Sequence, residues 1–293
     1  MSGGRISMDT CIFVGALKHK PSLGVAKRYA EAYGMRLRTI PRFEPLYHCY
    51  GLIKDAGFAI IWNGQQGTDA LVAEYCRAKH IPHVFMELGI LPQNGSFVFD
   101  RDGFCGRSNI WKMNPPQEGV DRMLEARAKV QQQYPRRNEG YVLVPLQVPM
   151  DTQMYYHWDG RTLQDVVDRT RAMFPDDKIV YRPHPKVQNV SDLRIPKGCR
   201  IESKGEFLEQ AAGAKVVVGV TSTCLYEAAL LEVPTIAIGD HPLKKTDDHD
   251  RVLANLYAHR IDADEPEPWR VIERLGLVPA GRTPRSLELA EAC

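Results

Sequence analysis

The chain has 293 residues, of which 44% are hydrophobic and 25% are charged, and these proportions exclude a wholly disordered protein. The formal net charge of +2 permits an anionic ligand but does not by itself indicate nucleic-acid binding. Seven cysteines without a CxxC pair argue against a disulfide framework or thiolate zinc site, and no signal peptide or membrane-span pattern is evident, so we expect a reduced, cytoplasmic protein without a transmembrane segment.

Strand-like and helix-like stretches alternate through the first half of the chain. Short apolar runs that end at glycine or a turn signal predict strands, and apolar residues at helical spacing predict helices. The expected strands are residues 11–16, 36–40, 59–62 and 83–87, and the expected helices are residues 22–33 and 68–79. Residues 91–115 are rich in glycine, asparagine and proline, and we expect loops there. This alternation favours a parallel α/β sheet.

The second half repeats the alternation. The expected strands are residues 141–146, 178–182, 215–220 and 235–238, and the expected helices are residues 117–132, 163–174, 207–212, 224–232 and 268–275. The charged run 239–250, which contains His241 and Pro242, is expected to be a solvated loop. A polar turn at residues 135–140 predicts two Rossmann-like α/β domains facing a cleft, residues 1–138 and 139–293. The last helix is a candidate to pack back on the first domain.

The segment Lys178–Lys186 (KIVYRPHPK) is an apolar strand that ends in a basic loop. Pro185 biases His184 toward extended geometry and so holds the imidazole at the strand end. An imidazole there can donate to a phosphate oxygen, and Arg182 and Lys186 add positive charge. By itself this loop is better explained as a solvated basic turn, and only its pairing with a second loop favours a phosphorylated ligand.

That second loop is Gly219–Glu227 (GVTSTCLYE), which follows another buried strand. Thr221, Ser222 and Thr223 stand just before a predicted helix, where hydroxyls and backbone N–H groups suit a phosphate. The Glu227 carboxylate on the first turns of the helix could accept hydrogen bonds from ribose hydroxyls. Helix capping alone would explain the hydroxyl residues almost as well.

Two carboxylates are candidates for chemistry. A strand within Val144–Met154 runs out into Gln147, which we expect to bind the nucleotide sugar, and into Asp151, which lies where the two halves would meet. A carboxylate at such a cleft can act as nucleophile, base or stabiliser of an oxocarbenium-like centre, and helix capping is the alternative. Glu87 ends an apolar strand beside Gly89 and is a candidate acid or base.

The loop Asp100–Ser108 carries Asp102, Arg107 and Ser108, which either line an acceptor side or belong to a surface hairpin. The nine histidines show no HxH or HExxH spacing, so we expect no metal site. No GxxxxGK[ST] or GxSxG motif occurs, which argues against a P-loop kinase and a nucleophile-elbow hydrolase.

Taken in order, these stretches resemble the capsular polysaccharide synthesis family, which includes the bacterial β-Kdo transferases. The resemblance covers roughly residues 80–240. It is carried by Glu87–Pro92, Asp100–Ser108, Val142–Asp151, the RPHP loop (residues 182–185), the hydroxyl loop (Gly219–Glu227) and the helix segment Ala228–Pro234. It implies a GT-B fold in which the C-terminal half holds the nucleotide. It also implies that His184 and Pro185, together with Thr221, Ser222 and Thr223, bind the nucleotide phosphate and ribose. If the mechanism is retaining, the resemblance makes Asp151 the nucleophile and Glu87 its acidic partner.

The leading hypothesis is therefore a glycosyltransferase, of hexosyl or Kdo type, that needs neither metal nor cofactor. It would move a sugar from a CMP- or UDP-linked donor to a glycan or lipid-linked glycan. Three alternatives remain open: a phage-type DNA glycosyltransferase acting on a hydroxymethylated base, a non-catalytic nucleotide- or glycan-binding module, and a nucleotide-sugar epimerase. For the DNA alternative, five side chains could contact the DNA phosphate backbone or could be ordinary exposed groups: Tyr134, Arg136, Arg137, Lys244 and Lys245.

Overall fold

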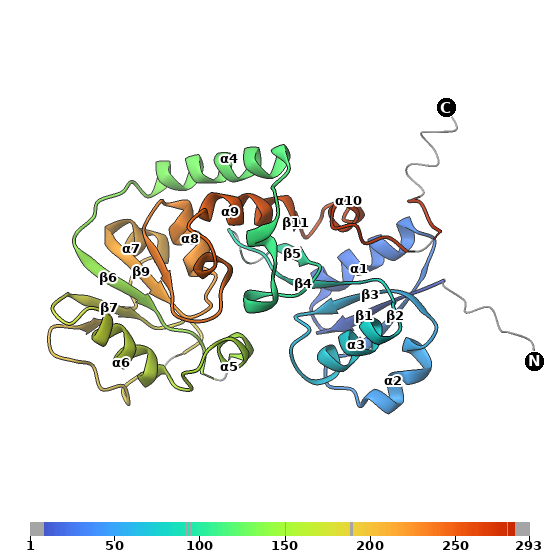
Figure 1. Ribbon diagram of the computed structural model, residues 1–293, viewed down its shortest axis with the longest axis horizontal. Helices are drawn as coiled ribbons and strands as arrows, with labels where there is room; N and C mark the ends of the chain where they lie inside the picture. Colours follow the sequence, from blue (N-terminus) through green and yellow to red (C-terminus); the bar gives the residue numbers. More distant parts are fainter. Residues whose placement is uncertain are drawn as a thin grey trace, which may run out of the picture. The chain divides into compact units, whose positions relative to one another are not determined.

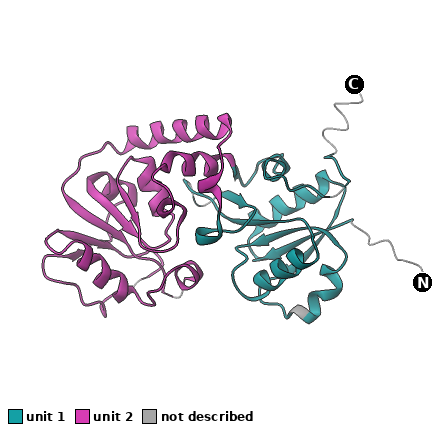
Figure 2. Ribbon diagram, viewed as in Figure 1, with its two compact units in different colours: residues 1–108, 259–293 teal, residues 109–258 magenta. Residues whose placement is uncertain are grey.

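The computed structural model describes residues 9–91, 93, 95–149, 151–187, 190–279 and 281–284 (Figure 1). Pro92, at the end of the first motif of the resemblance, lies outside them. The chain forms two compact units, residues 1–108 with 259–293 and residues 109–258 (Figure 2). Both are built from a largely parallel sheet with helices, which confirms the predicted α/β class.

The division of the chain differs from the expected boundary at 138/139, which falls inside the second unit. The physical reason is α4 (Gln117–Gln133), which packs against α8 (Cys224–Leu230) and α9 (His249–Ala258) of that same unit. The polar turn before residue 141 therefore connects two parts of one unit. After α9 the chain returns to unit 1 at His259.

Unit 1 contains a six-stranded sheet in the order β11-β5-β4-β3-β1-β2. Its strands are β1 (Thr10–Gly15), β2 (Arg36–Pro41), β3 (Ala56–Trp62), β4 (His83–Leu88), β5 (Ser96–Asp100) and β11 (Arg260–Asp262). The first four are parallel, whereas β5 pairs antiparallel with β4, and β11 antiparallel with β5. The prediction that residues 91–115 are rich in loops missed β5, whose five residues are all buried within the sheet.

The helices of unit 1 cover both faces of this sheet (Figure 1). They are α1 (Lys20–Ala32), α2 (Leu46–Ile53), α3 (Gly67–Ala78) and α10 (Trp269–Arg274), with a 3-10 turn η1 at Cys105–Arg107. On one face α2 and α3 bury Ile53 and Val72 against Ile61 of β3. On the other face α1 packs Tyr29 on Phe58, with ring centroids 4.7 Å apart. Tyr33, the C-cap of α1, donates a 2.7 Å hydrogen bond to Glu273, so α10 belongs to this unit.

Unit 2 contains a five-stranded parallel sheet in the order β10-β9-β6-β7-β8. Its strands are β6 (Tyr141–Pro145), β7 (Ile179–Arg182), β8 (Arg200–Ile201), β9 (Ala214–Gly219) and β10 (Thr235–Ala237). The remaining elements are α5 (Thr152–His157), α6 (Leu163–Met173), α7 (Phe207–Gly213) and the 3-10 turns η2 (Ile110–Lys112) and η3 (Pro242–Lys244). From β6 the chain builds β7 and β8 on one side and then β9 and β10 on the other, so the strand order reverses between β6 and β9.

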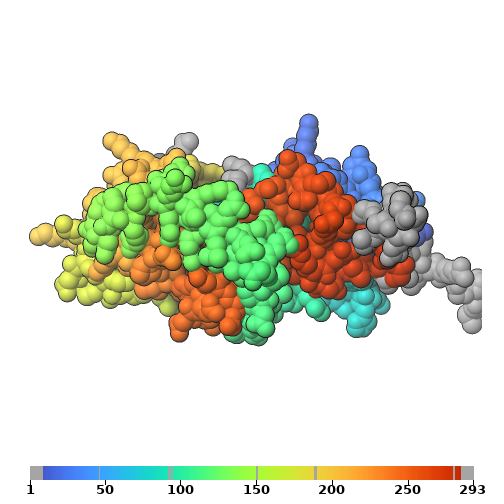
Figure 3. Space-filling model, turned by 90° about the horizontal axis from the view of Figure 1, so that it is seen from above, coloured from blue at the N-terminus to red at the C-terminus, as the bar shows by residue number. Residues whose placement is uncertain are grey.

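The sheet of unit 2 is covered by α5 and α6 on one side and by α7 and α8 on the other (Figure 1), and α9 packs against α8 and α4. Met154 of α5 and Val167 of α6 pack with Val144 and Val218 of the strands in one buried cluster. Helix α4 lies at the surface of this unit (Figure 3), and of its seventeen residues only Gly119, Met123 and Arg127 are buried.

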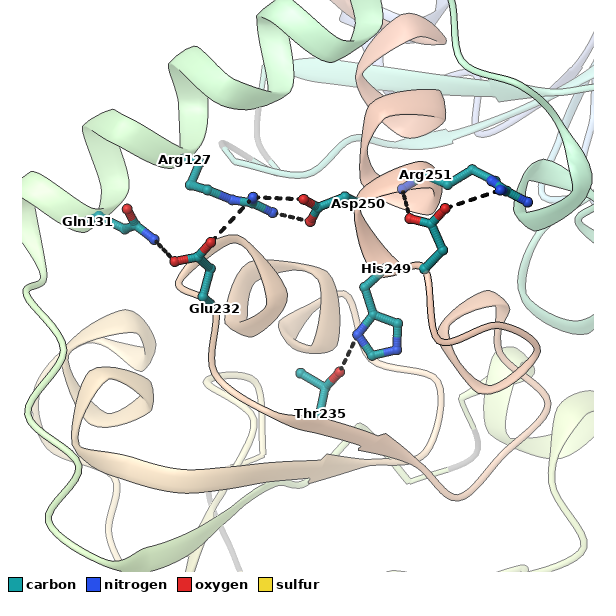
Figure 4. Close-up of polar contacts among 8 residues, drawn as sticks. Arg127, Gln131, Glu232, Thr235, His249, Asp250 and Arg251 are labelled. Carbon is teal, nitrogen blue, oxygen red and sulfur yellow. Dashed lines mark hydrogen bonds and ion pairs between the residues drawn. The ribbon is translucent and has the colours of Figure 1, made fainter.

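A charged network attaches α4 to the rest of unit 2 (Figure 4). Arg127 of α4 donates from both terminal nitrogens to the Asp250 carboxylate of α9, one of them at 3.0 Å, and lies 3.5 Å from Glu232. Gln131 donates to the same Glu232 at 2.9 Å. The Arg127 side chain is 10% exposed, so this bidentate pair stabilises a contact between segments more than one hundred residues apart in sequence.

The prediction that residues 239–250 form a solvated loop is wrong at both ends. His241 is fully buried, stacks against Tyr226 with centroids 4.5 Å apart, and accepts a hydrogen bond from the Leu243 backbone N–H. Burial lowers the pKa of His241 to about 3, so it is neutral. At the other end, His249 and Asp250 already belong to α9. None of the helices in the described ranges is both long and apolar enough to span a bilayer.

Candidate functional site

The candidate site of unit 2 lies at the carboxyl ends of its parallel strands. β6 leads to Gln147, β7 to His184 and β9 to Thr221, and all three strands run in the same direction. Gln147 and Thr221 follow the two strands between which the strand order reverses. Ligands of open α/β sheets bind outside the carboxyl ends of the strands at this kind of position.

Gln147 connects the β6 loop to the β9 loop. Its Oε1 accepts from the Thr221 backbone N–H at 2.9 Å, and its Nε2 lies 3.1 Å from Thr221 Oγ1. The same Nε2 donates to Asp151 Oδ2 at 3.3 Å. Gln147 and Thr221 are 6% and 5% exposed. The structure therefore brings Thr221 together with Gln147 and Asp151, which were selected from a different stretch of the sequence.

Asp151 is the N-cap of α5, as the alternative interpretation of this residue proposed. Its Oδ1 accepts from the Gln153 backbone N–H at 2.9 Å, which satisfies one of the free donors of the helix N-terminus. With Gln147 on Oδ2, each carboxylate oxygen has one protein donor. The side chain is half-buried. Capping and a chemical role are compatible here, because the cap fixes the direction of the carboxylate.

His184 uses its Nδ1 for a bond within the protein, whereas no hydrogen bond to its Nε2 is found among the described residues. Its Nδ1 accepts from the Lys186 backbone N–H at 3.1 Å, which places the proton of the neutral ring on Nε2. Burial and the charge of Lys186 lower the pKa of His184, and the charge of Asp151 opposes them. His184 and Asp151 are thus close enough to interact electrostatically. A neutral imidazole with Nε2–H can donate to a phosphate oxygen.

Two residues of the basic loop differ in their surroundings. Arg182 donates to the backbone carbonyls of Lys204 and Gly205 at 3.2 and 2.8 Å, so its guanidinium braces the chain that follows β8. Lys186 and Pro185 are exposed, and Lys186 keeps its ammonium at the surface beside His184. Of the two cations, Lys186 is therefore the better candidate for contact with an anion.

The hydroxyl loop contains one local side-chain bond to the backbone and one carboxyl group with a raised pKa. Ser222 Oγ accepts from the Cys224 backbone N–H at 3.2 Å, whereas Thr223, the N-cap of α8, makes no capping bond with its side chain. Glu227 is half-buried, and no described residue donates a hydrogen bond to its carboxylate. Burial raises the pKa of Glu227 to about 7. Such a carboxyl group is suited to bond with hydroxyls of a ligand.

Unit 1 places Glu87 beside an amide that the sequence analysis did not select. Asn63 Nδ2 donates to Glu87 Oε2 at 2.7 Å, and the Leu88 backbone N–H donates to Oε1 at 3.0 Å. Asn63 is 4% exposed and adopts φ 58°, a left-handed conformation that asparagine tolerates. The turn signal Asn63-Gly64 at the end of a buried strand could have identified it.

A buried carboxyl group of unit 1, like Asn63, was not selected by the sequence analysis. Asp69, in the first turn of α3, is fully buried and pairs with Arg42 at 2.6 Å. Burial raises the pKa of Asp69 to about 7, against the opposing effect of Arg42, and the charge of Glu87 adds to the rise. An aspartate in a first helical turn usually caps or faces solvent, so its sequence position gave no indication of this burial.

The predicted acceptor loop is held largely by its own side chains. Ser108 is buried and donates to Asp100 Oδ2 at 2.6 Å, and the backbone N–H of Asp102 donates to Oδ1 at 2.7 Å. Burial raises the pKa of Asp100 to about 6 despite these donors. Arg107 donates to the Gly64 carbonyl at 3.0 Å and so ties this loop to the turn beside Asn63. Ser108 thus has a structural partner inside the loop.

Several of the cations named for DNA contact have protein partners instead. Arg136 donates to the carbonyls of Ala212 and Ala214, and Arg137 donates to Glu139 and to the Glu209 carbonyl. These bonds satisfy the C-terminal end of α7, where backbone carbonyls lack helical partners. In addition, Lys245 pairs with Asp240 at 2.9 Å and Tyr134 donates to Glu206.

Comparison with known proteins places part of this chain in context. Residues 117–240 match the model of the family described as capsule polysaccharide biosynthesis protein. A curated relative, Protein FixF of Sinorhizobium fredii (strain NBRC 101917 / NGR234), is 25% identical over 201 residues, which are 64% of this chain and 49% of the relative. The chain thus spans about half the length of that relative.

Two solved structures share the fold. One is the beta Kdo 2,7 transferase of Thermosulfurimonas dismutans KpsC, with a TM-score of 0.61 at 16% identity, covering 90% of this chain and 98% of that one. The other is the beta Kdo 2,4 transferase of the same protein, with a TM-score of 0.62 at 13% identity, covering 92% and 98%. These findings confirm the predicted resemblance to the capsular polysaccharide synthesis family and the GT-B-like fold class.

Proposed function

We propose that this chain is a glycosyltransferase that moves a sugar from a nucleotide-linked donor to an acceptor hydroxyl. The observation that carries the proposal is the group formed by Gln147, Asp151, His184 and Thr221 at the strand-order reversal of unit 2. This group lies within the residues that match the family model. The names of the two similar structures make Kdo the first sugar to test, with CMP- and UDP-linked donors.

The donor would be held by neutral and cationic groups of unit 2. The Nε2–H of His184, the ammonium of Lys186 and the hydroxyls of Ser222 and Thr223 would contact phosphate oxygens. The carboxyl group of Glu227 would bond with ribose hydroxyls. Because these hydrogen-bond donors and the charge of Lys186 would stabilise the phosphate, we propose a transfer that requires neither metal nor cofactor.

For the chemistry we propose a two-step, retaining transfer. An oxygen of Asp151 attacks the anomeric carbon, the bond from that carbon to the phosphate oxygen breaks, and the nucleotide leaves. The acceptor hydroxyl then displaces Asp151 from the sugar and loses its proton to Glu87. The role of Glu87, which belongs to unit 1, rests on the family resemblance.

The proposal is tested first by ligand binding. CMP, UDP, GDP and their sugar conjugates, CMP-Kdo included, are screened by thermal shift, since a ligand that binds the native state raises its melting temperature. At a hundred times the dissociation constant the stabilisation is about 2.7 kcal/mol, or roughly 5–10 °C for a chain of this size. If none of the nucleotides or conjugates shifts the melting temperature, the proposal is wrong.

A turnover assay completes the test. The conjugate that binds is incubated with and without a panel of glycan acceptors, and the release of free nucleotide and the products are measured. Transfer requires products that carry the donor sugar on the acceptor. Isomerisation or hydrolysis of the donor at full rate without acceptor would instead indicate an epimerase.

A further inference from the structure

The side chain of Gln147 lies between a group that can only donate and a group that can only accept. On one side is the backbone N–H of Thr221, 2.9 Å from Oε1. On the other side is Oδ2 of Asp151, 3.3 Å from Nε2. These partners fix which end of the amide is oxygen and which is nitrogen. Both polar ends are therefore used inside the protein.

This environment fits glutamine better than any similar residue. Glutamate could still accept from Thr221 but would place a second negative charge against Asp151. Leucine would leave the Thr221 N–H and one oxygen of Asp151 without these bonds. Because Gln147 is only 6% exposed, a ligand would have to displace one of its protein partners to reach it.

We infer that Gln147 is a positioning residue, which ties the Asp151 carboxylate to the hydroxyl loop at Thr221, and not a ligand of the nucleotide sugar. The inference rests on the proposed function and refines it. Through this one amide, the group that would attack the sugar and the loop that would hold its phosphate share a fixed geometry. A misplacement of about 1 Å between reacting groups can cost about 100-fold in rate.

The far end of α5 is held to the same edge of the sheet. The Asp240 backbone N–H donates to the His157 carbonyl at 2.6 Å, and the Gly239 N–H donates to the Val220 carbonyl at 3.2 Å. A Cβ on Gly239 would lie 2.9 Å from the Val220 carbonyl and 3.0 Å from the His157 carbonyl, so only glycine permits this approach. Since α5 is anchored at both ends, the coupling through Gln147 acts on a fixed helix.

The test is Gln147→Glu, compared with a control that has the same bonding pattern. Gln164 accepts from the Arg194 backbone N–H at 2.9 Å and donates to Asp168 at 2.7 Å, also four residues along the chain, but both bonds lie at the exposed surface of α6. Gln164→Glu should leave turnover and donor affinity within about 2-fold of wild type, because an exposed pair contributes little. Gln147→Glu should lower turnover at saturating donor by about 100-fold.

Donor affinity separates positioning from direct binding. If Gln147 positions Asp151, the dissociation constant of free nucleotide rises by less than about 3-fold, and the acidic limb of the turnover profile moves to higher pH, since two adjacent carboxyl groups resist ionising together. If the dissociation constant rises by as much as turnover falls, Gln147 contacts the donor and the inference is overturned. If Gln147→Glu does not fold, the same comparison is made with Gln147→Met, which keeps the length of the side chain but removes its bonds to Thr221 and Asp151.

The wild-type protein distinguishes the failure of this inference from that of the proposed function. Wild-type protein that releases no nucleotide from any donor would overturn the transferase proposal and this role together. Active wild-type protein with an equally active Gln147→Glu variant would overturn only the positioning role.

Discussion

The two units repeat one arrangement at the carboxyl ends of their strands, but only unit 2 completes it. In both, a buried amide donates to a carboxylate: Asn63 to Glu87 at 2.7 Å and Gln147 to Asp151 at 3.3 Å. In both, a backbone N–H close in sequence donates to the other carboxylate oxygen. The difference lies in the oxygen of the amide. Gln147 Oε1 accepts from Thr221, whereas Asn63 Oδ1 is buried and finds no donor among the described residues.

That difference separates a preorganised site from an incomplete one. A buried acceptor without a donor costs about 1–3 kcal/mol, and a ligand that supplies a donor recovers that free energy. A sugar hydroxyl is a donor of the required kind. We therefore expect unit 2 to hold the geometry of Asp151 without substrate, whereas Asn63, which is 4% exposed, can bond with an acceptor only after a local rearrangement.

The largest effect is expected from substitution of Asp151, the carboxylate of the arrangement in unit 2. Asp151→Asn removes the proposed nucleophile but keeps a side-chain oxygen that can cap α5, so the fold should be retained. Turnover should fall by about 1,000-fold or more, while the nucleotide still raises the melting temperature. Nucleotide release and thermal shift measure the two properties separately. Full turnover in this variant would remove Asp151 from the mechanism.

A smaller effect is expected on donor binding from His184. His184→Ala removes the Nε2–H and should weaken nucleotide binding by about 10- to 100-fold, the cost of one hydrogen bond to a charged group. His184→Gln, which retains an N–H donor, should recover part of that loss. Isothermal titration with the nucleotide found in the screen gives both values. Equal affinities for wild type and His184→Ala would place the phosphate elsewhere.

The corresponding experiment in unit 1 changes Asn63, whose amide donates to Glu87. Asn63→Gly keeps the left-handed backbone at φ 58° but removes the amide, so the Michaelis constant for the acceptor should rise by about 10-fold with donor affinity unchanged. Asn63→Asp also tolerates this backbone conformation but sets a charge beside Glu87, and should be the more damaging of the two. If donor affinity changes and the Michaelis constant for the acceptor does not, Asn63 acts on the donor and this prediction is wrong.

The sequence contained enough information to locate the loops of unit 2 but not the bonds between them. Buried runs such as VVVG before Thr221 end in polar residues, and this pattern alone identifies the edge of a parallel sheet. By contrast, β5 and β11 are short strands paired across more than 150 residues, and such pairing leaves no local pattern. The role of Gln147 was also hidden, because a polar residue at a strand end is equally consistent with contact to a ligand and to the protein.

The smallest effect is on stability and concerns Glu227, the carboxyl group of unit 2 that has no donor among the described residues. Burial raises its pKa in the folded state from 4.5 to about 7, so the folded protein binds this proton more tightly than the unfolded chain does. The resulting stability is present below pH 4.5 and is lost as the pH rises through about 7. Glu227→Gln removes this dependence and should be about 1–2 kcal/mol more stable than wild type at pH 8, with little difference at pH 4.5. Urea unfolding at both pH values measures this. An equal difference at the two pH values would show that the carboxyl group does not titrate in this range. Weaker nucleotide binding by the stabilised variant would indicate that Glu227 contacts the nucleotide.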